Sequence, residues 1–90
     1  MAFRFPVDPY EDGVLDYYEI VKNPMDLQTM KLRLDYGKYK TKEAFYRDLE
    51  LIIENSRLYH RNNPDFLMIT KRFENLCTKV RRIFDPKKKR

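Results

Sequence analysis

The sequence has few of the residues on which most catalytic and metal sites depend. Its 90 residues include one Cys, one His, two Gly and no Trp. A single cysteine cannot form an internal disulfide, which indicates a reducing, intracellular setting. One Cys and one His cannot complete the ligand set of a structural zinc site, and two glycines cannot build a glycine-rich phosphate loop. We therefore expect no metal and no cofactor.

Long apolar segments are also missing from the chain. The longest aliphatic run is Leu51 to Ile53, which is too short to cross a membrane. The first ten residues lack an apolar stretch after a basic one, so they do not form a secretory signal. A hydrophobic content of 42% still suffices for a core, and the length fits one small domain. We expect that domain to span residues 1–86, with no membrane partner.

The positive charge is concentrated at the C-terminal end. The net charge is +5, and removing the four charges of the last four residues leaves +1 for residues 1–86. This basic tail consists of Lys87, Lys88, Lys89 and Arg90. Such a run is typical of a solvated terminus, a nuclear localisation signal or an arm that contacts phosphates. Weak nucleic-acid contact through the tail is therefore one expectation.

Apolar residues spaced three and four apart predict an all-α chain of helices packed antiparallel through short loops. The first predicted helix begins at Asn23-Pro24, an N-cap followed by a proline, and ends at Gly37. Thr41 and Asn63 are the expected caps of the next two. The predicted helices span residues 24–36, 42–60 and 64–84.

Residues 1–22 form a long loop rich in aromatic and apolar residues. Pro6, Pro9 and Gly13 interrupt regular structure there, apart from one short helical turn expected near Asp16 to Val21. Long loops in compact domains usually carry function, and aromatic walls suit a small, mostly apolar ligand. The alternative is that the loop only covers the helices as part of the core.

Catalytic residue patterns are weak. Cys77 and His60 could form a nucleophile and base, but Cys77 lies among apolar helix residues, where a buried thiol is the usual case. Ser56, the only serine, lies on the apolar stripe of a predicted helix, so we expect it to be a small core residue. We therefore expect a protein that is not an enzyme.

Several motifs resemble those of the bromodomain family, the reader modules of acetyl-lysine. Residues 16–27 read DYYEIVKNPMDL, which is similar to the family's most recognisable string. The segment Phe3-x-x-Pro6-Val7 and the stretch Asn55 to Tyr59 continue the pattern in the same order. The resemblance runs from about residue 3 to 84. It implies a left-handed, antiparallel helical bundle.

The resemblance also implies a pocket for acetyl-lysine. Its positions would be Phe3, Pro6, Val7, Val14, Tyr17, Tyr59, His60 and Phe66. Phe3 would be the aromatic of the family's shelf, and Pro6 and Val7 would form the floor and a wall. Tyr17 would bind the acetyl carbonyl through an ordered water, and Phe66 would be the bulky gatekeeper.

The sequence departs from the family pattern at two places. His60 stands where the family usually has an Asn that donates to the acetyl oxygen; neutral imidazole has one N–H donor with a different reach. The family's first helix precedes the loop with which this chain begins. The chain would then be a fragment, receive that helix from a partner copy, or expose an apolar groove that favours self-association.

These features predict a nuclear, non-catalytic chromatin reader that binds acetylated lysine on histone tails or other acetylated proteins. The alternative is a degenerate bromodomain that acts as an acetyl-independent interaction scaffold, with the basic tail contacting nucleic acid.

Overall fold

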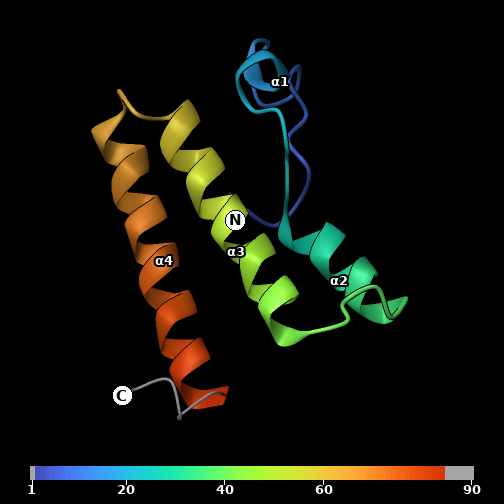
Figure 1. Ribbon diagram of the computed structural model, residues 1–90. Coiled ribbons are helices and arrows are strands. Elements are labelled where there is room, and N and C mark those ends of the chain that lie inside the picture. Colours follow the sequence, from blue (N-terminus) through green and yellow to red (C-terminus); the bar gives the residue numbers. More distant parts are fainter. Residues whose placement is uncertain (1, 85–90) are drawn as a thin grey trace.

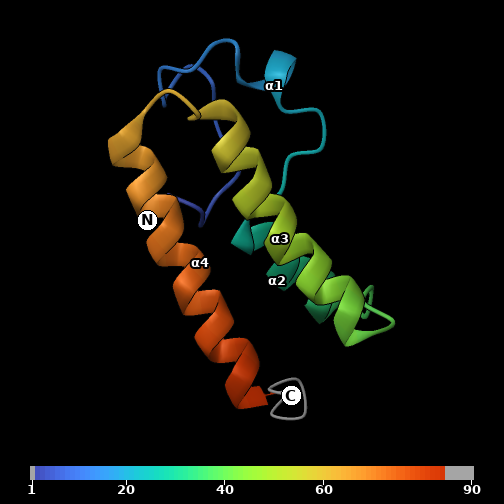
Figure 2. The ribbon, with the colours of Figure 1, turned by 60° about the vertical axis from the view of Figure 1, so that its left-hand side comes forward.

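The fold is an all-helical bundle in which a long helical hairpin supports a shorter helix and a loop. The computed structural model describes residues 2–84. Its helices are α1 (Tyr17–Ile20), α2 (Leu27–Asp35), α3 (Lys42–Tyr59) and α4 (Pro64–Phe84). Helices α3 and α4 run antiparallel, α2 lies on the other side of α3, and the loop around α1 sits at the end where α3 passes into α4 (Figures 1 and 2). The predicted all-α bundle is confirmed.

Side-chain caps fix where the two long helices begin. The Thr41 hydroxyl accepts a hydrogen bond from the Ala44 amide at 3.1 Å, and the Asn63 Oδ1 accepts one from the Phe66 amide at 3.1 Å. Each bond satisfies a donor that the first turn of a helix otherwise leaves unpaired. The predicted bounds of α4 match the structure, and those of α3 differ by one residue at its end.

The predicted start of α2 was wrong by three residues, because Asp26 and not Asn23 is the N-cap. Asp26 is 5% exposed, and its carboxylate accepts from the Thr29 amide at 2.9 Å and the Thr29 hydroxyl at 2.6 Å. The Asn23 carbonyl instead accepts from the Asn55 side chain at 2.8 Å. A contact with α3 therefore holds Asn23 outside the helix.

Helix α2 ends in the turn that its glycine predicted. The Lys38 amide donates to the Arg33 carbonyl at 2.8 Å and the Gly37 amide to the Leu34 carbonyl at 3.1 Å, the two bonds of a Schellman motif. Gly37 has a φ of +67°, where a side chain would be strained. The chain can therefore reverse directly toward α3.

A polar cluster joins α2 to α3 beyond that turn. Asp48 accepts hydrogen bonds from the Arg33 guanidinium at 3.0 Å and from the Tyr39 hydroxyl at 2.7 Å. Burial, together with the hydrogen bond to Asp48, raises the pKa of Tyr39 to about 12. Tyr39 therefore stays protonated and donates at every physiological pH.

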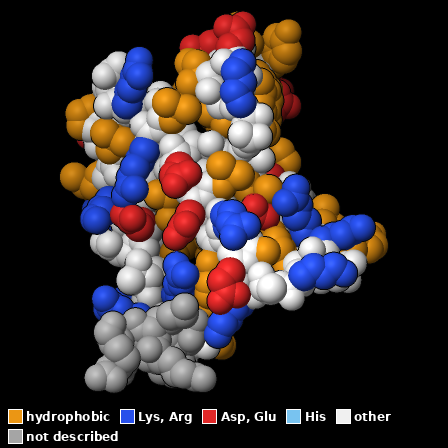
Figure 3. Space-filling model, in the orientation of Figure 1, with side chains coloured by type: hydrophobic (Ala, Val, Ile, Leu, Met, Phe, Trp, Pro, Cys, Tyr) orange, Lys and Arg blue, Asp and Glu red, His pale blue; other side chains and the backbone are white. Residues whose placement is uncertain are grey.

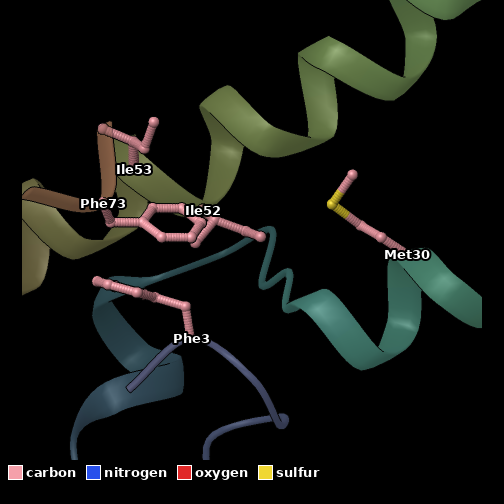
Figure 4. Packing of buried hydrophobic residues seen from close by; sticks show 5 residues of the cluster. All are labelled: Phe3, Met30, Ile52, Ile53 and Phe73. Carbon is pink, nitrogen blue, oxygen red and sulfur yellow. The ribbon is translucent and has the colours of Figure 1, made fainter. Parts of the chain in front are cut away.

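The core lies where the N-terminal segment enters between the helices. Its buried cluster consists of Phe3, Met30, Ile52, Ile53 and Phe73. Phe3 points from the N-terminal segment toward Phe73 of α4, and their ring centroids are 4.5 Å apart (Figure 4). One aromatic residue of the loop thus joins α3 and α4 in the centre of the bundle.

No helix within residues 2–84 is long and apolar enough to cross a membrane. The predicted basic tail, Lys87 to Arg90, lies outside the described residues.

Candidate ligand-binding pocket

A cavity of about 500 Å³ lies between the loop and the adjoining ends of α3 and α4. Its walls are mostly apolar and aromatic, with a few polar groups, which is the composition of a small-ligand site. The lining residues are Ala2, Phe3, Phe5, Pro6, Val7, Asp8, Asp12, Val14, Tyr17, Met25, Ile52, Ser56, His60 and Phe66.

Two tyrosine hydroxyls hold the loop that forms one side of the pocket. The Tyr18 hydroxyl donates to the Val7 carbonyl at 2.5 Å. This bond connects α1 to the part of the loop that precedes it. The Tyr59 hydroxyl, at the end of α3, donates to the Asp16 carboxylate. This bond raises the pKa of Tyr59, because ionisation would remove the donor beside a carboxylate. The loop is therefore fixed both to itself and to α3.

Backbone contacts anchor the two ends of the same loop. The Leu27 amide donates to the Phe3 carbonyl at 2.9 Å, and the Gln28 amide to the Arg4 carbonyl at 2.9 Å. These donors belong to the first turn of α2, which has no intrahelical partner for them. The first turn of α2 thus positions Phe3 and Arg4, from which the loop continues around the pocket.

His60 lines the pocket just after the end of α3, and two aromatic contacts orient its ring. Its ring stacks on Phe66 with centroids 3.7 Å apart and an interplanar angle of 15°. It also meets the Tyr59 ring edge-on at 4.9 Å. Burial lowers the pKa of His60, so the imidazole is neutral at pH 7 and offers one donor and one acceptor.

Tyr17 contributes an aromatic wall that the end of α3 supports. It is 8% exposed, and its ring centroid lies 5.0 Å from that of Tyr59. Burial raises the pKa of the Tyr17 phenol, so the hydroxyl remains protonated and can donate. Tyr59 itself is not among the lining residues; it packs behind Tyr17.

One face of α3 lines the pocket and was missed as a binding surface. Ser56 lies one turn before His60 and Ile52 two turns before it, so the spacing of four residues brings all three to one side. The Ser56 and Thr70 hydroxyls are 2.6 Å apart, and Thr70 donates to the Phe66 carbonyl at 3.0 Å. Residue spacing could have identified this face, but Ser56 was assigned to the core alone.

The pocket rim is acidic although the chain as a whole is basic. Five carboxylates and no basic residue occur between Phe5 and Val21. Asp8 and Asp12 line the pocket and close the loop through backbone bonds: Asp12 accepts from the Asp8 amide at 3.0 Å. In Figure 3, acidic side chains lie at the top of the molecule, where Figure 1 shows the loop around α1. The rim therefore favours cationic neighbours of a bound group.

Eight residues were predicted to form the pocket. Seven of them line this cavity, and Tyr59 is the exception. Phe3 also contributes to the core, so it is more deeply placed than a shelf residue at the pocket edge. Within residues 2–84, no group of three or more His, Cys, Asp or Glu side chains could hold a metal ion. The predicted nucleic-acid residues lie outside the described segment.

The helical bundle and its loop-lined, mostly apolar pocket have the architecture that a small-ligand recognition module requires. The chain belongs to the bromodomain family, whose model matches residues 1–72. Bromodomains are generally non-catalytic modules that read acetyl-lysine.

The similar proteins agree with this assignment. The second bromodomain of Bdf1 from Candida albicans, solved with an imidazopyridine, superimposes with a TM-score of 0.84 at 33% identity, covering 88% of this chain and 74% of that one. Histone acetyltransferase GCN5 of Yarrowia lipolytica is 38% identical over 91% of this chain. An ankyrin repeat, bromo and BTB domain-containing protein of Dictyostelium discoideum is 41% identical over 70% of it.

These relatives are much longer than the present chain. It spans 18% of the length of the GCN5 protein and 8% of that of the Dictyostelium protein. The comparison therefore concerns the bromodomain and not the activities of the surrounding proteins.

Proposed function

We propose that this chain is a non-catalytic, nuclear reader module that binds acetylated lysine on histone tails. The observation that supports this proposal is the pocket that combines Tyr17, His60 and Phe66 at the end of the helical hairpin. Acetylation converts an ammonium group into a neutral amide with a methyl group. An apolar cavity with a few donors suits that group.

His60 takes the donor role in this proposal. Its neutral ring has one N–H, and its stack on Phe66 restricts the directions in which that N–H can point. The acidic rim favours the basic residues that flank lysines in histone tails. Tyr17, which also lines the pocket, provides a second donor through its hydroxyl, acting through an ordered water.

Calorimetric titration with an acetylated histone-tail peptide and its unmodified counterpart tests the proposal. Tyr17→Phe removes a hydroxyl from the pocket, so we expect about fivefold or greater loss of affinity. Tyr36→Phe is the matched control, because Tyr36 is 75% exposed and does not line the pocket. Equal binding of both peptides would contradict the reader function, and equal affinity in all three proteins would exclude Tyr17 as a donor.

The second candidate function is an acetyl-independent interaction scaffold, which His60 favours because it replaces the family's usual amide. An unmodified protein segment that binds as tightly as any acetylated peptide would support this function. Contact of the basic tail with nucleic acid is a separate part of this candidate. It predicts binding that falls steeply with salt and disappears when residues 87–90 are deleted; affinity that survives the deletion would exclude the tail.

A further inference from the structure

Two hydroxyl groups lie in direct contact where the pocket meets the helical hairpin. Ser56 of α3 lines the pocket and is 5% exposed, and Thr70 of α4 has no exposed surface. Their oxygens are 2.6 Å apart, and the Thr70 hydroxyl donates to the Phe66 carbonyl at 3.0 Å. A chain of hydrogen bonds therefore runs from the pocket to the backbone of α4.

The number of protons fixes the direction of this chain. Each hydroxyl carries one proton that it can donate. A carbonyl can only accept, so the Thr70 proton is used in the bond to Phe66. The Ser56 hydroxyl must then donate its own proton to Thr70. The Ser56 oxygen has no proton left for a ligand and can only accept.

This acceptor has unused capacity. Thr70 is the single hydrogen-bond partner of the Ser56 hydroxyl within residues 2–84. A hydroxyl oxygen has two lone pairs, and a buried acceptor without a donor is unfavourable. A ligand that brings a donor to Ser56 gains what the free pocket lacks. The pocket therefore favours ligands with a donor in its buried part.

Burial along α3 shows which part of a ligand reaches Ser56. His60 is half-buried, whereas Ser56 lies one turn earlier and is almost fully buried. Four residues of a helix span about 6 Å. This step rests on the proposed function, in which His60 binds the acyl carbonyl. The acyl end of the ligand, and not the lysine stem, then extends toward Ser56. An acetyl group ends in a methyl, which has no donor.

The cavity has room for a longer acyl group. Its volume of about 500 Å³ is within the range of pockets that hold drug-sized molecules, roughly 300–1,000 Å³. Asp8 and Asp12 also line it with acceptors, but both are exposed, so a bond to either carboxylate only replaces a bond to water. Ser56, as the buried acceptor, has the greater effect on selection.

We propose that the pocket binds lysine carrying a short hydroxyacyl group, such as 3-hydroxybutyryl, and that Ser56 accepts a hydrogen bond from the acyl hydroxyl. Thr70 is a positioning residue, because it holds the Ser56 proton away from the ligand. An apolar pocket without such an acceptor would prefer the plain acyl group, since burying an unpaired hydroxyl is costly.

Calorimetric titration with one histone-tail peptide in five forms tests the proposal. Its lysine is unmodified, acetylated, butyrylated, 3-hydroxybutyrylated or 3-methoxybutyrylated. Both enantiomers of each chiral group are used, and the one that binds more tightly is compared. The methoxy group keeps the oxygen but cannot donate. We expect the hydroxybutyryl peptide to bind about fivefold or more tightly than the butyryl peptide, and the methoxybutyryl peptide to bind most weakly of the three.

Three variants assign this preference to the buried hydroxyls. Ser56→Ala removes the acceptor, so the butyryl peptide should become the tighter ligand. Thr70→Val frees the Ser56 proton to donate to an ether oxygen, so the discrimination against the methoxy group should disappear. Thr78→Ala is the matched control, because it removes an exposed hydroxyl of α4 that does not line the pocket. Circular dichroism verifies that all three variants are folded.

Wild-type binding of the butyryl peptide that is as tight as that of the hydroxybutyryl peptide would overturn the proposal. A hydroxyl preference that persists in Ser56→Ala would overturn it as well, and an unchanged methoxy discrimination in Thr70→Val would overturn the role of Thr70. In these cases the reader function stands as long as the acetylated peptide binds more tightly than the unmodified one. If no acylated peptide does so, the reader function fails too.

Discussion

His60 combines a fixed ring orientation with a single donor in the pocket. Two substitutions separate these properties. His60→Phe keeps a ring that can stack on Phe66 but removes the donor, so affinity for the acetylated peptide should fall about tenfold. His60→Asn restores the amide that the family usually has there and should strengthen binding. Calorimetry that finds the same affinity in all three proteins would exclude His60 as the donor.

The lowered pKa of His60 predicts a pH dependence of stability. Because the folded-state pKa lies below the unfolded value of about 6.5, the unfolded chain binds more protons in the interval between them. The free energy of unfolding therefore rises with pH through that interval and levels off near pH 7. As the pH falls from about 7 to 5, wild type should lose stability relative to His60→Phe in urea unfolding. A constant difference would contradict this prediction.

Pocket residues that belong to a recognisable motif could be predicted from the sequence. Residues that only the packing of the helices brings to the pocket were missed. Tyr17 and Phe66 line the cavity as expected. Ser56 was read as a core residue, because hydrophobic periodicity does not distinguish a buried side chain from one at the floor of a pocket. Its pairing with Thr70 joins residues fourteen positions apart on two helices. No local pattern predicts that pair.

At the scale of elements, two of the three predicted caps are confirmed. Thr41 and Asn63 act as predicted. For α2, local propensity favoured Asn23 with its following proline, whereas Asp26 caps the helix in the structure. The hydrogen bond from Asn55 to the Asn23 carbonyl decides the matter in the folded chain. A contact across thirty-two residues overrode a local preference.

The cap of α2 gives a prediction for stability. Asp26→Ala removes the two hydrogen bonds that its buried carboxylate accepts from Thr29, so it should cost about 1–2 kcal/mol in the free energy of unfolding. Asp35→Asn is the control: its pair with Lys31 is exposed, and we expect a change near zero. Urea denaturation followed by circular dichroism measures both. Equal changes in the free energy of unfolding for the two variants would show that the Asp26 cap does not stabilise α2.

At the scale of the molecule, one aromatic contact joins the pocket loop to the helical hairpin. Phe3 lines the pocket, and its ring centroid lies 4.5 Å from that of Phe73 of α4, where both rings are buried. Phe3→Ala removes a buried ring from the core, so it should cost about 3–5 kcal/mol in the free energy of unfolding. Phe5→Ala is the control, because Phe5 belongs to the same loop but is 54% exposed. Equal losses for the two variants in urea unfolding would show that the contact of Phe3 with Phe73 does not hold the loop on the hairpin.

The central claim is that the pocket recognises the acetyl group itself. The most direct measurement is an NMR titration of the ¹⁵N-labelled chain with an acetylated histone-tail peptide and with its unmodified form. We expect the acetylated peptide to shift the amide signals around Tyr17, Tyr59, His60 and Phe66, and the unmodified peptide to leave them in place. Equal shifts with both peptides, or none with either, would contradict the claim.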